Sequence, residues 1–309
     1  MQNRYTGDIG DFAKYGLLRA LGEGLRLGVA WYLFPDEGHN EDGRHVDYLR
    51  TPDRWRHLDP ELFDQLAVIA QSGERKVYRI ESSGILPSTT FHSTTLDFEG
   101  SGEIRAKARA EWFRTALTGL ADREVVFADP DNGLCEDNRC SASSRTHWKR
   151  IPLSEAHVLS AGRTGIIYHH NTRRAGGHFN EIQYWLQMLG SDSVALYWRR
   201  YSNRTFFVVQ PTRLIRERIE EFVERWSPHF EYIGPTARPD PRRVQQKSGR
   251  PIEELPQGTG KTCPECGYGF SGPGWGGIDA HWKASHEEIM PYAEAWPIIK
   301  AGRRPSDVG

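Results

Sequence analysis

The chain has 309 residues, with 40 lysines and arginines against 41 aspartates and glutamates, so its net charge is −1. A hydrophobic content of 38% is enough for a core, which excludes a chain that is disordered throughout. The balanced charge excludes a protein that is basic over its whole surface, but not one with a local basic patch. The length predicts one large domain and a smaller one.

Neither a membrane-spanning helix nor a secretory signal is expected. No stretch of about 18 apolar residues occurs, and residues 1–5 are not the apolar segment that a signal peptide needs. Only four cysteines are present, and two of them have the spacing of metal ligands. This usage is typical of a reducing compartment, so we expect a cytoplasmic protein that does not contact membranes.

Helical and extended patterns alternate along residues 1–235. In chain order they predict helix 11–21, strand 28–34, helix 60–71, strand 76–80, helix 104–120, strand 124–128, helix 153–160, strand 165–168, helix 179–189, strands 194–198 and 205–210, and helix 214–226. The last two strands are too close in sequence for a parallel crossover, so they are predicted to pair as an antiparallel hairpin. The predicted fold class is α/β, an open Rossmann-like and mostly parallel sheet that ends in this hairpin.

A linker and a small module are predicted to follow this domain. Residues 236–250 carry five basic residues and one acid, and residues 236–262 contain four prolines and few apolar side chains. This composition is typical of a flexible linker, here a basic one at 236–262. We predict a metal-binding module at 263–290 and a loose C-terminal tail at 291–309.

The module at 263–290 contains a set of cysteines and histidines with the spacing of zinc ligands. The four residues are Cys263, Cys266, His281 and His286. Two thiolates and two imidazoles at this spacing close a tetrahedral zinc site. Phe270 and Ile278 supply apolar positions between the ligand pairs, and the segment resembles a C2H2 zinc finger of the ββα kind. Docking on nucleic acid, contact with a protein and a purely structural role all remain open for it.

Polar residues follow three of the predicted strands, in the segments 34–43, 129–133 and 169–173. Ligands of open α/β sheets bind beyond the carboxyl ends of the strands, so we expect a site there. The run Asp129-Pro130-Asp131-Asn132 resembles the Asp-Pro-Pro-aromatic motif of methyltransferases that act on amino groups, with Asp131 and Asn132 in place of the second proline and the aromatic. The same run also fits a simple turn.

The N-terminal run from Gly7 to Tyr15 resembles the opening of the large-subunit ribosomal RNA adenine-N6 methyltransferases of the RlmJ type. Gly7, Asp11 and Lys14 match that family in identity and spacing, whereas Asp8 replaces an asparagine and Tyr15 a histidine. In that family this segment folds over the S-adenosylmethionine site.

The resemblance therefore implies methyl transfer to a nucleic acid. It places Gly7, Asp11, Lys14, Tyr15, Asp36, Glu37 and Gly38 at the S-adenosylmethionine site. Asp129 and Asn132 would orient the acceptor. The target base, the choice between DNA and RNA, and the oligomeric state do not follow from the sequence.

Two other functions fit the same strand ends. A Mg²⁺-dependent phosphodiesterase would use the carboxylates of Asp36, Glu37, Asp129 and Asp131 as metal ligands, with His169 or His170 as a base. A binding protein that has the sheet but no chemistry is the third possibility.

Five arginines flank the last strands of the predicted sheet: Arg173, Arg174, Arg199, Arg200 and Arg204. They are expected either to contact phosphates of a nucleic acid or to be solvated surface residues. Two further cysteines, Cys135 and Cys140, are expected to be ordinary loop thiols. The alternative is a second metal site that includes His147.

Overall fold

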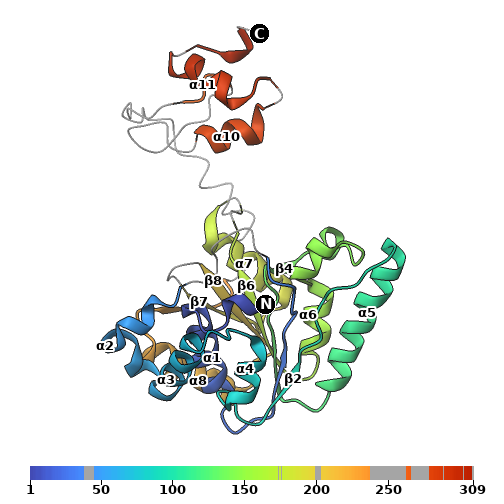
Figure 1. The fold of residues 1–309 in the computed structure, drawn as a ribbon, viewed down its shortest axis with the longest axis vertical. Helices are drawn as coiled ribbons and strands as arrows, with labels where there is room; N and C mark the ends of the chain where they lie inside the picture. Colours follow the sequence, from blue (N-terminus) through green and yellow to red (C-terminus); the bar gives the residue numbers. More distant parts are fainter. Residues whose placement is uncertain are drawn as a thin grey trace. The chain divides into compact units, whose positions relative to one another are not determined.

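The computed structural model describes residues 1–37, 45–172, 174, 176–198, 203–236, 262–265, 278–287, 289–301 and 303–307. The chain divides into two compact units, Met1–Ala237 and Arg238–Gly309, each described here by itself. The first unit contains the sheet, and the second contains the helices α10 and α11 (Figure 1).

A seven-stranded sheet in the order β2-β1-β3-β6-β8-β7-β9 forms the centre of the first unit. Its strands are β1 (Leu27–Ala30), β2 (Thr89–His92), β3 (Val125–Ala128), β6 (Thr164–His170), β7 (Val194–Trp198), β8 (Arg204–Val209) and β9 (Phe230–Ile233). The strands β2, β1, β3 and β6 are parallel, whereas β8 is antiparallel to both β6 and β7, and β9 is antiparallel to β7. The sheet is therefore mixed and Rossmann-like, with a parallel core and antiparallel outer strands; the predicted hairpin is confirmed, but the sheet continues past it to β9.

Helices cover both faces of this sheet, because side chains along each strand point alternately to opposite faces. Val125 and Phe127 of β3 belong to one apolar cluster, and Val126 and Ala128 to the other. The first cluster is completed by α1 (Ile9–Gly22), α2 (Pro52–Trp55), α3 (Pro60–Gln71), α4 (Val77–Ser83) and α8 (Arg213–Arg225). The second is completed by α5 (Gly102–Gly119), α6 (Leu153–Ser160) and α7 (Gly177–Leu189) (Figure 1).

Helix α1 is buried on nearly all sides, since it packs between the sheet and the helices around it. It begins at Asp8, whose side chain accepts a hydrogen bond from the Asp11 N–H and so satisfies one of the free donors of the first turn. Gly16 allows α8 to approach, because a Cβ atom there would lie 2.3 Å from Cζ2 of Trp226. The residues of the N-terminal run are thus held rigidly against the sheet.

The prediction of a strand at 76–80 is wrong. These residues belong to α4, whose buried side chains Val77 and Ile80 are three positions apart and face the core. Gly84 ends the helix in the left-handed conformation, with φ of 76°. A short apolar run fits a strand and a buried helix equally well, and contact with the sheet decides between them.

Four strands were not predicted: β2, β9, and the two-stranded parallel pair of β4 (Gly133–Cys135) and β5 (Arg150–Pro152). All four are short, with three or four residues each. Segments of this length carry too few alternations of apolar and polar residues to stand out in a sequence.

Cys135 and Cys140 are joined by a disulfide bond, which corrects the expectation of free loop thiols or metal ligands. Strand β4 ends at Cys135, and a 3₁₀ turn at Asp137–Arg139 then reverses the chain. The two Cα atoms are consequently 6.3 Å apart, within the reach of a disulfide.

The second unit has a small core that includes part of the predicted tail. Helix α10 (Ile278–Ser285) contributes Ile278 and Trp282, and α11 (Tyr292–Lys300) contributes Ala295 and Ile299. The indole of Trp282 donates a hydrogen bond of 2.8 Å to the carbonyl of Met290. The segment at 291–309 therefore contains a helix that packs on the metal-binding module. Most of the predicted linker at 236–262 lies outside the described residues.

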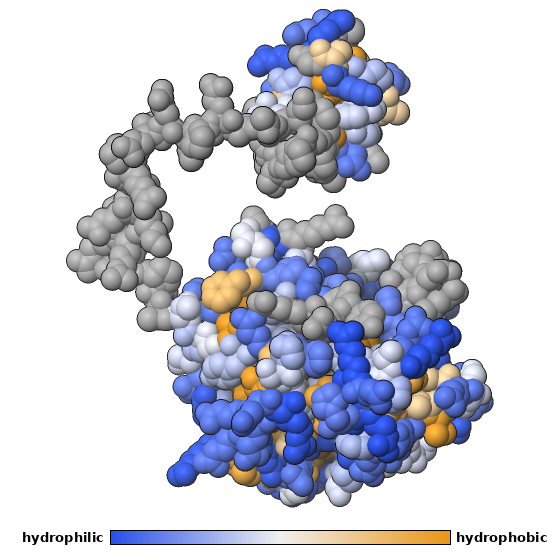
Figure 2. All heavy atoms as spheres, turned by 90° about the vertical axis from the view of Figure 1, so that its left-hand side faces the viewer, coloured by the Kyte–Doolittle hydropathy of each residue, from blue (hydrophilic) through white to orange (hydrophobic). Residues whose placement is uncertain are grey.

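The described surface is mainly hydrophilic on the face that Figure 2 draws, where hydrophobic side chains lie in small separate areas. Among the helices that the structure describes, none is long and apolar enough to cross a membrane.

Candidate functional site

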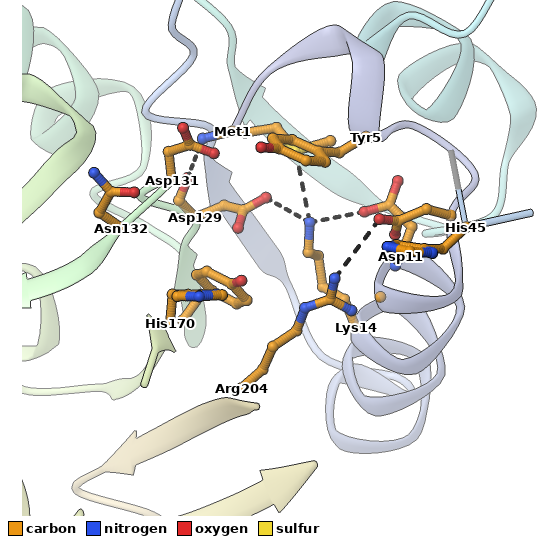
Figure 3. A pocket seen from close by; sticks show the side chains of 13 residues that line it. Met1, Tyr5, Asp11, Lys14, His45, Asp129, Asp131, Asn132, His170 and Arg204 are labelled. Carbon is orange, nitrogen blue, oxygen red and sulfur yellow. Dashed lines mark hydrogen bonds and ion pairs between the residues drawn. The ribbon is translucent and has the colours of Figure 1, made fainter. Parts of the chain in front are cut away.

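A pocket of about 270 Å³ lies in the first unit, where β1, β3 and β6 end (Figure 3). Its lining comes from distant parts of the chain. The N-terminal run contributes Asp8, Gly10, Asp11 and Lys14, the segment after β3 contributes Asp129, Asp131 and Asn132, and the final strands contribute Tyr168, His170 and Arg204. Met1, Tyr5 and His45 complete it. The volume is close to the lower limit for small-molecule sites.

Lys14 connects the N-terminal run with the segment after β3. Its ammonium nitrogen lies 2.8 Å from Oδ1 of Asp11 and 2.7 Å from Oδ2 of Asp129 (Figure 3), and all three side chains are buried. Burial by itself would lower the pKa of Lys14, but the two carboxylates raise it above its ordinary value. The lysine is therefore a permanent cation between two carboxylates.

Asp11 is held in place by other residues of the N-terminal run. Its Oδ2 atom accepts hydrogen bonds from the Gly7 N–H at 2.9 Å and from the Tyr15 hydroxyl at 3.1 Å. Burial raises the pKa of Asp11, and the neighbouring Asp8 raises it further, whereas Lys14 opposes the rise. Burial also raises the pKa of Tyr15, which is thus a neutral donor. Gly7 and Tyr15 do not line the pocket but position Asp11.

A second polar cluster surrounds Asp131 and Glu37. The side-chain amide of Gln2 donates to Oδ2 of Asp131 at 2.6 Å and to Oε2 of Glu37 at 3.3 Å. The ammonium of Lys149 contacts Glu37 and lies 3.9 Å from Oδ2 of Asp131. Sequence reasoning missed Gln2 and Lys149, since neither belongs to a recognisable motif.

Asp36 and Glu37 lie beside the pocket rather than in its lining. The carboxylate of Asp36 accepts the Arg4 N–H at 3.1 Å. Gly38, the third residue that was predicted in this loop, lies outside the described residues.

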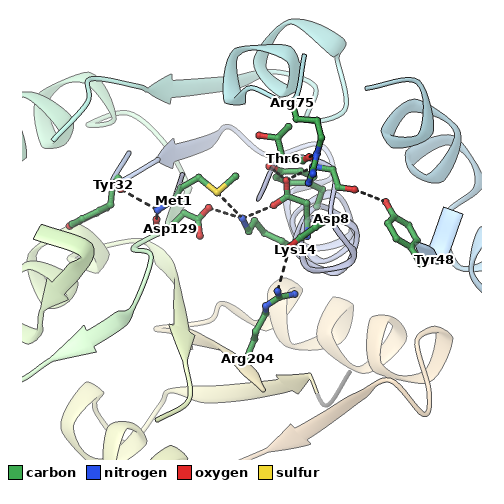
Figure 4. A network of polar contacts seen from close by, with 12 residues as sticks. Met1, Thr6, Asp8, Lys14, Tyr32, Tyr48, Arg75, Asp129 and Arg204 are labelled. Atoms are coloured by element: carbon green, nitrogen blue, oxygen red, sulfur yellow. Dashed lines mark hydrogen bonds and ion pairs between the residues drawn. The ribbon is translucent and has the colours of Figure 1, made fainter. Parts of the chain in front are cut away.

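Met1 lies across the ends of β1 and β3. Its amine donates to the carbonyls of Tyr32 at 3.2 Å and Asp129 at 2.9 Å, and its carbonyl accepts the Phe34 N–H at 2.8 Å. The first residues thus cover the buried pair of Lys14 and Asp129 (Figure 4).

The two predicted histidines have different surroundings, because consecutive residues of β6 face opposite sides of the sheet. His170 lines the pocket. His169 is buried away from it, with Nδ1 accepting the Leu134 N–H at 3.0 Å and Nε2 3.1 Å from Oε1 of Glu181. Burial lowers the pKa of His169, which holds the segment after β3 against β6 as a neutral imidazole.

Gly133 allows the segment after β3 to lie against His169. Replacing this glycine with alanine should lower the free energy of unfolding by about 3 kcal/mol. Its φ is +82°, and a Cβ atom would lie 2.4 Å from Nδ1 and 2.6 Å from Cα of His169. Urea denaturation measures the change. Gly162→Ala is the matched control, because its φ is +73° but nothing lies within 4 Å of the added atom. The control substitution should lower the free energy of unfolding by about 1 kcal/mol, because it adds backbone strain alone. Equal losses in both variants would contradict the assigned contact.

The two arginines of the predicted phosphate-binding set that the structure describes lie in different surroundings. Arg174 stacks on Tyr184 at 3.6 Å from the ring centroid and pairs with Glu136 at 3.8 Å. Arg204 is buried and lines the pocket. The other three, Arg173, Arg199 and Arg200, lie outside the described residues.

In the second unit, three of the four predicted zinc ligands come together. The ligand atoms of Cys263, His281 and His286 all lie within 4.8 Å of one another. Cys263 is buried, and Nε2 of His286 is a buried atom without a hydrogen-bond partner in the described part of the chain. A thiolate and two imidazoles at this separation fit a metal such as zinc. Cys266, the fourth predicted ligand, lies outside the described residues.

The four carboxylates that were considered as Mg²⁺ ligands all have partners. They are Asp36, Glu37, Asp129 and Asp131, and they contact Arg4, Gln2, Lys14 or Lys149. Within the described ranges, the set of Cys263, His281 and His286 is the one group of three or more cysteine, histidine or acidic ligand atoms close enough to share a metal.

Comparisons with known proteins do not assign this chain to a family. No model of a known protein family matches the sequence, and no curated protein matches it either.

Proposed function

We propose that the chain is an S-adenosylmethionine-dependent methyltransferase that acts on nucleic acid, with the pocket at the ends of β1, β3 and β6 as its active site. The observation that carries the proposal is the ion pair of 2.7 Å between Lys14 and Asp129. It joins the two segments that resemble methyltransferase motifs, although they are 115 residues apart in sequence. Both segments line one pocket on a Rossmann-like sheet.

The charge of the pocket supports a cationic ligand. Four carboxylates line it, from Asp8, Asp11, Asp129 and Asp131, against the cations of Lys14 and Arg204 and the amine of Met1. A surplus of negative charge in a partly enclosed site favours a positively charged guest, such as a sulfonium. Tyr5 and Tyr168 add aromatic rings to the lining, and aromatic faces attract organic cations.

S-adenosylmethionine would supply an activated methyl group when bound, and the residues of the chain would orient the acceptor. The Asp129 carboxylate, fixed by Lys14, would accept a hydrogen bond from an exocyclic amine, and the amide of Asn132 would hold the second hydrogen. The ammonium of Lys14 lies 2.7 Å from Oδ2 of the Asp129 carboxylate. Tyr168, whose pKa is raised by burial to about 12, would offer a neutral ring and hydroxyl to the acceptor.

Two features support a nucleic acid as the acceptor. Both motifs resemble those of enzymes that modify bases, and the second unit contains the Cys/His group. A single zinc module of this size reads only about three base pairs, so it would add affinity rather than select a sequence.

The geometry supports the Mg²⁺-dependent phosphodiesterase less well. The ammonium of Lys14 lies 2.7 Å from Oδ2 of Asp129, one of the four carboxylates considered as Mg²⁺ ligands. A permanent cation there competes with the metal for the same oxygens.

Calorimetric titration and methyl transfer test the proposal. We expect the chain to bind S-adenosylmethionine and to transfer a tritiated methyl group to a mixture of DNA and RNA. Asp129→Asn should reduce the transfer rate at least about 100-fold, because the acceptor loses its charged hydrogen-bond partner.

Asp122→Asn is the matched control, since Asp122 is an exposed residue paired with Arg123. It should transfer at the rate of the parent chain. No heat of binding at millimolar S-adenosylmethionine, together with no transfer, would overturn the proposal.

A further inference from the structure

Arg204 is a buried cation that the methyl-transfer scheme does not use. It is 8% exposed, and its Nη1 atom is buried without a hydrogen-bond partner among the residues described. Its Nη2 atom forms an ion pair with Oδ2 of Asp8 at 3.6 Å, which is too long for a hydrogen bond. An unsatisfied guanidinium donor in a buried position is costly, which calls for a ligand group that satisfies it.

The chain makes room for this guanidinium at the first turn of α1. Gly10 lines the pocket beside Arg204, and a Cβ atom on it would lie 1.7 Å from Nη1 of Arg204. The N-terminal end of a helix carries partial positive charge and repels a cation. The Asp11 and Ile9 N–H groups of this turn already donate to the Asp8 carboxylate and the His45 carbonyl, so an oxyanion placed here would be held chiefly by Arg204.

We propose that Arg204, placed against the first turn of α1, binds an oxyanion of the pocket's ligand. The pocket then has two chemically distinct parts, with the carboxylate of Asp131 for a cationic group and Arg204 for an anionic one. A zwitterionic amino-acid end carries both groups. This inference rests on the proposed function for the source of the oxyanion, which is the carboxylate of the cofactor or a phosphate of the acceptor.

The test uses the full chain, three probes and two variants. The probes are S-adenosylhomocysteine, its decarboxylated analogue, which lacks only the carboxylate, and inorganic phosphate. Arg204→Gln removes the cation. Gly10→Ala keeps the charge but displaces the guanidinium, and it guards against a folding failure of the first variant. Arg213→Gln is the control, because that side chain is 93% exposed on α8.

For a cofactor carboxylate, we expect the parent chain to bind S-adenosylhomocysteine about 10- to 100-fold more tightly than the analogue, as for a lost charged hydrogen bond. In both variants the difference in affinity between the two compounds should disappear, and the affinity for the analogue should equal that of the parent chain. If the oxyanion is a phosphate of the acceptor, inorganic phosphate should bind the parent chain and not the variants. The difference in affinity between S-adenosylhomocysteine and its analogue should then be the same in the parent chain and in the variants.

Unchanged binding of all probes by both variants would overturn the inference. If the parent chain binds phosphate through Arg204 but neither adenosyl compound, the methyl-transfer proposal fails and the oxyanion site stands. If it binds none of the three, both fail.

Discussion

Replacing Lys14 with methionine should lower the free energy of unfolding by about 3–5 kcal/mol at neutral pH, the cost of breaking a buried ion pair by removing one partner. Asp11 and Asp129 would then be left buried without the ammonium that lies within 2.8 Å of both. Urea denaturation measures the loss. Lys107→Met is the control, since it removes an exposed lysine paired with Glu103 on α5. That change should cost less than about 0.5 kcal/mol.

The loss caused by Lys14→Met should shrink as the pH falls. Burial already raises the pKa of Asp11 above its ordinary 3.8, and Lys14 is the main group that opposes the rise. A carboxyl whose pKa is higher in the folded state binds its proton more tightly there, so protonation stabilises the fold as the pH falls toward the ordinary value. In the parent chain, Lys14 stays protonated over this acidic pH range because its pKa is raised, so the lysine itself adds no pH dependence to the free energy of unfolding.

Adding Asp11→Asn to the Lys14 variant separates this explanation from simple loss of packing. The double variant should recover part of the stability at neutral pH and lose most of the pH dependence, because Asp129 is then the only remaining carboxylate of the two that Lys14 paired with. A pH-independent loss in Lys14→Met, unchanged by the second substitution, would show that the lysine acts through its aliphatic chain.

Loss of metal should unfold the second unit while the first unit stays intact. Among the residues of the second unit that the structure describes, the buried members of the apolar core are Cys263, Ile278, Trp282, Ala295 and Ile299, a core too small to fold a module unaided. Structural zinc supplies about 10–16 kcal/mol to peptides of this kind at neutral pH. We expect about one zinc ion per chain, and its removal by a chelator should melt α10 and α11.

The indole N–H of Trp282 reports this event, since it donates to Met290 at 2.8 Å only when α10 and α11 are packed. Its NMR signal, assigned with Trp282→Phe, should move to a random-coil position on chelation and in Cys263→Ser. Cys135→Ser is the control, because Cys135 belongs to the disulfide in the first unit. A purified chain without zinc whose Trp282 signal stays dispersed would contradict the metal site.

Much of the fold could be predicted from local patterns. The helices at 60–71 and 153–160 and the strand at 194–198 have the predicted bounds. Each has a capping residue or an apolar period that depends only on its own side chains, as at Asp59, whose carboxylate caps Leu62. The group of Cys263, His281 and His286 could be predicted for the same reason, since the spacing of these residues is a local property of the sequence.

The candidate site depended on contacts that no local pattern contains. The order of the strands brings Lys14 to Asp129 across 115 residues, and the pleat of β6 turns His170 into the pocket and His169 away from it. Arg204 had the sequence context of a surface residue, yet Gly10 leaves room for it inside. Local patterns predicted most of the helices and strands and the candidate residues, because propensity and periodicity act within a few positions. Which charges meet could be learned from the fold alone, because burial and pairing depend on neighbours that are distant along the chain.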